Sequence, residues 1–475
     1  MEDKTKHYIN GAWVAQTPAC PSIVLDPSTE QPVATISLGS QREVDSAVSA
    51  ARAAQNDWAN LPQEHRTDHV RRLLHIYTAR AEEMAVAIST EMGAPIDLAR
   101  DHQAPAGSWH IEGFLDAIKH HKAEEPLHDG SSETIVRDPV GVCGLITPWN
   151  WPMNQVTLKV IPAVLVGCTV VLKPSEIAPL SSMLFAEMID EAGFPAGVFN
   201  LVNGDGIGVG SALSAHPQVD MMSFTGSTRA GMAVGKACVD SMKRCTLELG
   251  GKSPNLIFAD ADIATAVAAG VQLCMQNTGQ SCNAPTRMLV ERAVYDEAVN
   301  IASETAKAIK VGPSHVEGSH IGPLVSANQY DIVQKYIRIG EDEGARLVAG
   351  GLGHPEGMAQ GYFARPTVFA DVSNDMRIAQ EEIFGPVLVM IPFDTEEDAI
   401  RIANETPFGL AAFLSTSDPA RVQRVSRRLR AGMISANSAD FEKGSPFGGF
   451  KMSGIGREGG VFGLEDFLEI KTIAI

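Results

Sequence analysis

Residues 140–146 read VGVCGLI, an apolar run in which polar and apolar positions do not alternate. Similar runs follow at 169–172 (TVVL), 198–202 (VFNLV) and 219–224 (VDMMSF). Short unalternated runs are typical of parallel strands buried on both faces of a sheet. Helical patterns lie between and after them, at residues 155–167, 179–192, 207–215 and 229–240. This succession predicts an α/β fold with a doubly wound sheet.

The chain on either side of this region carries further elements. Asn-Gly between apolar residues in YINGAWV (8–14) predicts a β-hairpin with a type I′ turn. Residues 41–59 and 62–92 each have the spacing of an amphipathic helix. A second series of strands and helices begins near Leu256 and continues through 387–391, which predicts a second α/β domain.

Size and charge exclude several classes of protein. With 475 residues, the chain is expected to form two or three domains. Its 38 Lys and Arg against 57 Asp and Glu give a net charge of −19, which repels nucleic acid and anionic membranes. We find no signal peptide and no apolar run of 18 residues. Seven cysteines without a C-x-x-C pair predict no disulfide framework, no metal site and a cytoplasmic protein.

Two segments fit neither predicted core. Residues 119–139 are rich in charge around a Gly-Ser turn, and the tail 467–475 alternates like an exposed strand. An unpaired strand edge invites pairing with another chain, so subunit association through these segments is one interpretation. A simple surface hairpin is the other.

Glycine-rich turns offer candidate phosphate sites. The one formal G-x-G-x-x-G, at residues 454–459, lacks the βαβ context that a dinucleotide site requires. Residues 204–210 and 224–231 lie better, after a strand and before a helix, where backbone N–H groups can face a pyrophosphate. Tight turns alone would explain both. In LKPSE (172–176), Glu176 follows a strand and could hold ribose hydroxyls, with Lys173 beside it.

The run TGQSCNAPTR places Cys282 in a loop or at a helix start. A helix N-terminus lowers the pKa of a thiol, and the thiolate is the nucleophile. Taken alone, a single cysteine is more often an inert core thiol, because free cysteine is among the most buried residue types.

Six ordered motifs carry a resemblance that covers essentially the whole chain. They are TPWNWP (147–152), LKPSE (172–176), LELGGKSP (247–254), TGQSCNAPTR (278–287), EEIFGPV (381–387) and PFGGFKMSG (446–454). In this order they resemble the NAD(P)-dependent aldehyde dehydrogenase superfamily, of the hydrolytic, non-acylating type.

The resemblance implies a fold and a division into domains. A Rossmann-like, NAD-binding domain would comprise residues 1–118 and 140–250, and a catalytic α/β domain residues 251–450. Residues 119–139 and 451–475 would form a small β-strand oligomerisation arm with the C-terminal tail. It also implies a homodimer or homotetramer.

The same resemblance implies catalytic roles. Cys282 would attack the aldehyde, and Asn150 with the Cys282 backbone N–H would stabilise the oxyanion, a task that needs preorganised donors. Glu248 would activate the water that hydrolyses the thioester, as a carboxylate of raised pKa can. Lys159 would lie near the cofactor and the proton path, although an ordinary exposed helix lysine remains the alternative.

The cofactor would be NAD, with NADP possible because Lys173 could neutralise a 2′-phosphate. The residues expected to bind it are Ile146, Trp149, Lys173, Ser175, Glu176, Gly206, Gly226, Ser227, Glu382 and Phe384.

The substrate would be a small-molecule aldehyde, fairly apolar, medium-sized or aromatic. Its channel is expected to include Trp151, Gln155, Ser281, Asn283 and Phe441, with Asn154 and Leu158 nearby. Lys443 could meet an anionic tail or simply be solvated.

Three alternatives stay open. A CoA-acylating aldehyde dehydrogenase would share the fold, but it would not need a base at Glu248. A non-catalytic binding or structural protein would not need Cys282, Glu248 and Asn150 together. A cysteine hydrolase would need a Cys–His pair, and none is identifiable among the 13 histidines.

Overall fold

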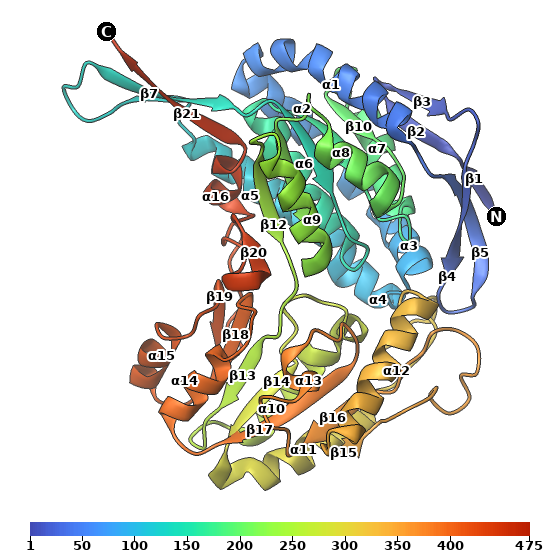
Figure 1. The fold of residues 1–475 in the computed structure, drawn as a ribbon, viewed down its shortest axis with the longest axis vertical. Coiled ribbons are helices and arrows are strands. Elements are labelled where there is room, and N and C mark those ends of the chain that lie inside the picture. The colour runs from blue at the N-terminus through green and yellow to red at the C-terminus, as the bar shows by residue number, and fades with distance from the viewer.

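The computed structural model describes residues 1–475, which form two lobes and a projecting arm (Figure 1). The first lobe is built on an eight-stranded sheet and the second on a seven-stranded sheet. Each sheet is parallel at its centre and has an antiparallel strand at an edge. The predicted fold class is therefore confirmed.

The four apolar runs that decide the fold are adjacent strands of the eight-stranded sheet. Residues of β8 alternate between two core clusters, with Cys143 and Leu145 facing one and Val142 and Ile146 the other, so both faces are buried. The predicted hairpin forms one edge, with positive φ at Asn10 as a type I′ turn requires. In sheet order the strands are β20 (Gly454–Ile455), β12 (Arg244–Glu248), β11 (Met221–Thr225), β8 (Val142–Ile146), β9 (Thr169–Lys173), β10 (Phe199–Leu201), β2 (Lys6–Ile9) and β3 (Ala12–Ala15).

Helices cover both faces of this sheet (Figure 1). One face packs against α1 (Gln41–Asn60), α8 (Ser211–Ala215) and α9 (Thr228–Val239). The other packs against α2 (Gln63–Ala79), α3 (Ala81–Met92), α5 (Ala104–Ala117), α6 (Pro152–Val166) and α7 (Leu180–Glu191). Short helices α4 (Ile96–Leu98) and α16 (Gly460–Glu465) complete the lobe.

Two predicted helices differ from the structure. The stretch 62–92 is two helices, because Arg80 leaves the helical conformation (φ −105°, ψ 20°) while its guanidinium pairs with Glu83 and Glu187. No proline or glycine stands there to indicate the break. The stretch 207–215 is α-helical only in its second half, since residues 206–210 form a π-helical turn.

The second sheet carries the lower lobe in Figure 1. The segment 249–253 connects β12 of the first sheet directly to β13 of the second. In order, its strands are β15 (Arg346–Ala349), β16 (Thr367–Ala370), β17 (Val387–Phe393), β14 (Arg287–Glu291), β13 (Pro254–Ile257), β18 (Ala411–Ser415) and β19 (Met433–Ala436). Its helices are α10 (Ile263–Met275), α11 (Tyr295–Ala308), α12 (Ala327–Asp342), α13 (Arg377–Gln380), α14 (Glu396–Asn404) and α15 (Pro419–Ser426).

The arm is a three-stranded antiparallel sheet of β21 (Leu468–Ala474), β7 (Glu133–Pro139) and β6 (Glu124–Pro126), and it projects from the first lobe (Figure 1). Of the expected tail 451–475, only β21 runs along this arm. β20 joins the eight-stranded sheet, and α16 packs on α5. A small sheet of β1 (Glu2–Lys4), β5 (Gln31–Ser37) and β4 (Pro21–Asp26) lies near the N-terminus. None of the helices combines the length and apolar character that crossing a membrane requires.

Candidate active site

The loop that carries Cys282 is held in a rarely populated backbone conformation. Asn277 (φ 52°), Thr278 (φ 57°) and Gly279 (φ 71°) are consecutive left-handed residues. At Gly279 a Cβ atom would lie 2.1 Å from the carbonyl oxygen of Gly385, so only glycine fits. Such conformations persist only where the surroundings enforce them, and they are typical of functional sites.

Hydrogen bonds from neighbouring segments enforce this conformation. Asn277 Nδ2 donates to the backbone carbonyl of Asn150 (2.9 Å), and Thr278 Oγ1 donates to that of Gly322 (3.0 Å). The side chain of Gln280 accepts from the Val325 N–H (3.0 Å). The loop before β14 is therefore fixed against the segment that follows β8.

Asn150 lies beside Cys282, where the structure brings the ends of the two sheets together. It follows β8, is buried, and lines the same cavity as Cys282. Its Nδ2 donates to the carbonyl of Gln280 (3.0 Å), which orients the amide. The second N–H of this group is free to serve as an oxyanion donor.

Cys282 is a half-buried thiol in a turn, with no helix beginning at it. Burial is the main cause that raises the pKa of this thiol, and the carboxylates of Glu382 and Glu248 raise it further. The backbone N–H groups of Cys282 and Asn283 act in the opposite direction. Of the two predicted placements, a loop or a helix start, the structure shows the loop, so the lowered pKa that a helix start would give is not found and two nearby carboxylates act the other way.

Glu248, the last residue of β12, is a buried carboxylate with two unpaired oxygens. Burial raises the pKa of Glu248 well above its ordinary value, and the nearby carboxylate of Glu458 adds to the rise. Lys159 and Arg457 lower the pKa in part. A carboxylate with this environment can act as a base near neutral pH.

Lys159 is fully buried and pairs with Glu458 through its Nζ. This burial excludes the alternative that Lys159 is an ordinary exposed helix lysine. Glu458 was not predicted as a site residue. It lies inside the GIGREG run (454–459), and reciprocal backbone hydrogen bonds with Phe447 hold it (2.7 and 2.8 Å). Lys159 and Glu458 are 299 residues apart, so no local pattern in the sequence indicates that they pair.

One cavity of about 230 Å³ opens on one side of Cys282. Glu382 Oε1 accepts from the backbone N–H of Gly251 (2.9 Å), and burial raises the pKa of Glu382 to about 7. Phe384 packs edge-to-face on Trp149 at 5.4 Å. The lining also includes Asn150, Gly226, Ser227, Gly250 and Gln329.

Near this cavity, α9 and β9 present the other expected cofactor residues. Ser227 caps α9, its Oγ accepting from the Ala230 N–H (3.3 Å). At the end of β9, Lys173 Nζ donates to the carbonyls of Gly204 (2.6 Å) and Pro174 (2.8 Å) and lies 3.3 Å from Glu176.

The remaining expected cofactor residues lie around this strand end. Lys173 and Ile146 both face Gly210 in the turn that Gly206 begins. Ser175 is buried, and its Oγ accepts from the Ile177 N–H (3.3 Å).

A second cavity, of about 250 Å³, opens on the other side of Cys282. Trp151 Nε1 donates to Ser281 Oγ (2.8 Å) in its wall. Gln155 and Asn283 line it as expected, with Asn154. Phe441 does not, because it is 44% exposed on a loop. Six residues that were not predicted complete the wall: Leu273, Gln276, Ala284, Pro285, Phe413 and Phe447.

Cys282 is the one residue that lines both cavities. The two cavities share no other wall residue, so a group bound in either one meets a group bound in the other at this sulfur.

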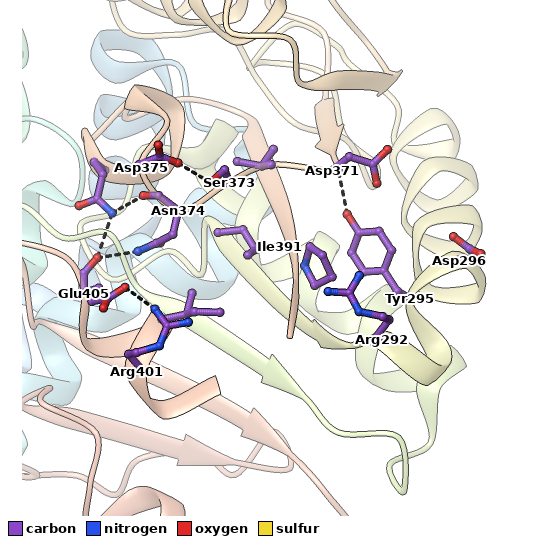
Figure 2. A pocket seen from close by; sticks show the side chains of 14 residues that line it. Arg292, Tyr295, Asp296, Asp371, Ser373, Asn374, Asp375, Ile391, Arg401 and Glu405 are labelled. Atoms are coloured by element: carbon purple, nitrogen blue, oxygen red, sulfur yellow. Dashed lines mark hydrogen bonds and ion pairs between the residues drawn. The ribbon is translucent and has the colours of Figure 1, made fainter. Parts of the chain in front are cut away.

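A further cavity, of about 1080 Å³, contains none of the motif residues. It lies at the carboxyl ends of β14, β16 and β17. Figure 2 shows hydrogen bonds and an ion pair among several of the polar groups that line it. Arg401 pairs with Glu405 (2.9 Å), and the Asp371 N–H donates to Tyr295 Oη (2.7 Å).

Comparisons with known proteins agree with this geometry. The model of the aldehyde dehydrogenase family matches residues 13–473. The chain belongs to the aldehyde dehydrogenase family. This confirms the predicted reaction class, NAD(P)-dependent oxidation of an aldehyde, over the non-catalytic alternative.

Solved and curated relatives of this aldehyde dehydrogenase cover nearly the whole chain. The structure of an aldehyde dehydrogenase from Bartonella henselae is 53% identical, with a TM-score of 0.99 over 100% of both chains. A mutant of aldehyde dehydrogenase C from Pseudomonas syringae, in complex with NAD+ and octanal, is 47% identical, with a TM-score of 0.97 over 99% of this chain and 96% of that one. A 3-succinoylsemialdehyde-pyridine dehydrogenase from a Pseudomonas species is 49% identical over 100% of this chain and 99% of its own.

Proposed function

We propose that this aldehyde dehydrogenase converts an aldehyde to a carboxylic acid with Cys282 as its nucleophile and NAD as its cofactor. The observation that carries the proposal is that the two cavities meet at Cys282 alone. The cavity with Ser227, Glu382 and Phe384 would receive the nicotinamide end of the cofactor. The cavity with Trp151 and Gln155 would receive the aldehyde.

The residues on the cofactor side fit a dinucleotide. The first N–H groups of α9 and the Gly226 turn suit a pyrophosphate, since helix N-termini attract anions. Glu176 suits the ribose hydroxyls at the end of β9. Lys173 is engaged by two backbone carbonyls, so it is not free to bind a 2′-phosphate, and this favours NAD over NADP.

The chemistry begins when the Cys282 sulfur attacks the aldehyde carbon and its thiol proton leaves. Cys282 is only partly buried, so the thiol proton leaves to solvent and this step does not require Glu248. Asn150 Nδ2 and the Cys282 N–H stabilise the oxyanion of the thiohemiacetal. A nicotinamide ring held beside Ser227, Glu382 and Phe384 would supply the hydride acceptor, and the former aldehyde carbon would stay on Cys282 as a thioester.

Hydrolysis then needs a base, and Glu248 supplies it. It removes a proton from water as the water attacks the thioester, and Cys282 leaves as the thiolate. The buried Lys159–Glu458 pair beside Glu248 offers the proton a route onward. A base at this position supports hydrolysis over transfer of the acyl group to coenzyme A.

We also propose a homodimer or homotetramer in the cytoplasm. β21 is an unpaired edge of the arm sheet, with Ile470 71% exposed. Val239 and Met242, at the end of α9, are 70% and 88% exposed. Apolar side chains on an open strand edge are typical of association surfaces. Light scattering of the wild type and of Ile470→Glu tests the oligomer, and cell fractionation tests the compartment.

The experiment that tests the reaction is an aldehyde panel run with NAD and with NADP, with reduced cofactor and acid product both measured. We expect one mole of carboxylic acid for each mole of NADH. Formation of an acyl-CoA in the presence of coenzyme A would support the acylating alternative, and no turnover with any aldehyde would contradict the proposal.

A further inference from the structure

The aldehyde-side cavity is walled by uncharged polar and aromatic groups. Four carboxamides line it, those of Asn154, Gln155, Gln276 and Asn283, together with three aromatic rings. No Asp, Glu, Lys or Arg is part of the wall. A charged substrate would leave water without gaining a partner of opposite charge, which is strongly unfavourable.

Two basic side chains near this cavity, His110 and Lys443, offer no free positive charge to it. His110 Nε2 donates to Asn154 Oδ1 (2.7 Å), and burial lowers the pKa of His110 to about 4, so it is neutral at pH 7. Lys443 pairs with Glu112 on α5. Neither of these two side chains is available to bind the carboxylate of a substrate.

Gln155 is the one wall residue with a buried side-chain polar atom that has no hydrogen-bond partner. It lies on α6, one turn beyond Trp151, and is 3% exposed. Its Oε1 is sealed from solvent and has no partner. The neighbouring polar groups are satisfied, Asn154 by His110 and Trp151 by Ser281.

A buried carbonyl oxygen without a partner is costly to the fold and rare in proteins. Gln155 is part of the wall of the cavity that ends at Cys282, and a rotation of its terminal amide, a soft torsion, would turn Oε1 toward the cavity, where a ligand can supply the missing donor. A hydroxyl or an N–H group is the uncharged donor that fits.

We propose that Gln155 is a specificity-determining residue and that the substrate is an uncharged, ring-bearing aldehyde with a hydroxyl or amide N–H that donates to Gln155 Oε1. The rings of the wall receive the ring of the substrate, and Gln155 orients it. This inference rests on the proposed function of the same site, and it adds the chemical class of the aldehyde.

The test compares matched aldehydes on matched variants. The hydroxylated probes are 3- and 4-hydroxybenzaldehyde, and the controls are the corresponding methylbenzaldehydes, of nearly equal shape. Succinic semialdehyde and betaine aldehyde serve as charged probes. The variants are Gln155→Met and, as a control, Gln272→Met, which makes the same change on the exposed face of α10.

In the wild type we expect kcat/KM for at least one hydroxylated probe to exceed that of its methyl partner about tenfold, as a site built for a hydrogen bond discriminates. Both charged probes should be at least about 100-fold poorer. Gln155→Met should reduce the hydroxyl-to-methyl ratio to about one while it retains turnover of the methyl probe. Gln272→Met should keep the wild-type ratio. A ratio of two substrates on one enzyme does not respond to a merely structural loss.

Two failures are distinguishable. If no aldehyde yields NADH, the proposed function fails. If the aldehydes are oxidised but the wild-type ratio is near one, or Gln155→Met leaves it unchanged, the role of Gln155 is overturned. Preference for a charged probe would overturn the substrate class.

Discussion

The two cavities that meet at Cys282 have similar volumes, about 230 and 250 Å³. They differ in the structural elements and residues that line them. The cofactor side combines glycine turns, the start of α9 and the ends of parallel strands with the side chains of Trp149, Glu382 and Phe384. At Gly250, a Cβ atom would lie 2.1 Å from Glu382 Oε2, so even a methyl group does not fit. The aldehyde side is made of side chains from α6, α10 and distant loops. In the proposed function, the first cavity holds a common cofactor and the second sets which aldehyde reacts.

The most severe way to break this arrangement is to remove the sulfur that both cavities share. Cys282→Ala should reduce kcat by at least about 10⁴, as removal of a nucleophile does elsewhere. NAD should still bind, because the cofactor side is intact. Steady-state kinetics and NAD titration by calorimetry measure the two effects. Retained oxidation would refute the nucleophile, and lost NAD binding would show that the two sides are not independent.

Glu248→Gln should be the next most damaging change. We expect steady-state turnover to fall about 10³-fold, within the range for a lost general base. Acylation should survive, so stopped-flow absorbance should show a burst of NADH followed by slow turnover. Without the burst, Glu248 would act chiefly in the first step.

Asn150→Ala removes an oxyanion donor from the boundary of the two cavities. Losing one such donor typically lowers kcat about 10²- to 10³-fold. The effect should appear in kcat for every aldehyde, since the donor serves the reacting carbon and not the substrate's tail. A change confined to one class of aldehyde would instead place Asn150 in substrate selection.

A change on the cofactor side alone should alter cofactor choice and leave aldehyde choice unchanged. In Glu176→Gln, the carboxylate that repels a 2′-phosphate is lost, so the ratio of kcat/KM for NADP to that for NAD should rise about tenfold. The ranking of aldehydes should not change. An unchanged cofactor ratio would mean that the engaged Lys173 and the shape of the site, and not the charge, reject NADP.

The smallest expected effect concerns pH. Glu248 is a base only when ionised, and its pKa is raised, so kcat should fall as the pH falls through a value well above that of an ordinary carboxyl group. Glu458→Gln removes the anion that raises this pKa. The acid limb of the kcat–pH profile, where kcat falls with pH, should therefore move to lower pH by about one unit. Lys159→Met removes a cation that lowers it and should move the limb upward. Shifts of the same sign in both variants would contradict the assignment of the limb to Glu248.

The contrast between the cavities also explains what the sequence could predict. The apolar runs 140–146 and 169–172 and the Gly226 turn use local patterns that any chain of this fold needs, so the first sheet and most of the cofactor side were predictable. Phe413 and Phe447 reach the aldehyde cavity from β18 and a loop, through packing that no local pattern records. Glu458 meets Lys159 only because the chain returns to the first sheet as β20.

The electrostatics of the thiol itself could not be predicted, for the same reason. Local residues around Cys282 suggested a loop or a helix start, whereas Glu248 and Glu382, which raise its pKa, come from distant segments. The motifs indicate Cys282 as the candidate nucleophile, but its charge environment depends on the folded site.

The most direct test of the account is to trap the intermediate on Cys282. Glu248→Gln should be mixed with NAD and an aldehyde, quenched in acid during the burst, and digested for mass spectrometry. We predict an acyl group on the peptide that contains Cys282, in an amount equal to the burst of NADH, and none when NAD is omitted. A full burst with no acyl adduct, or an adduct on another cysteine, would contradict the claim that both cavities serve this sulfur.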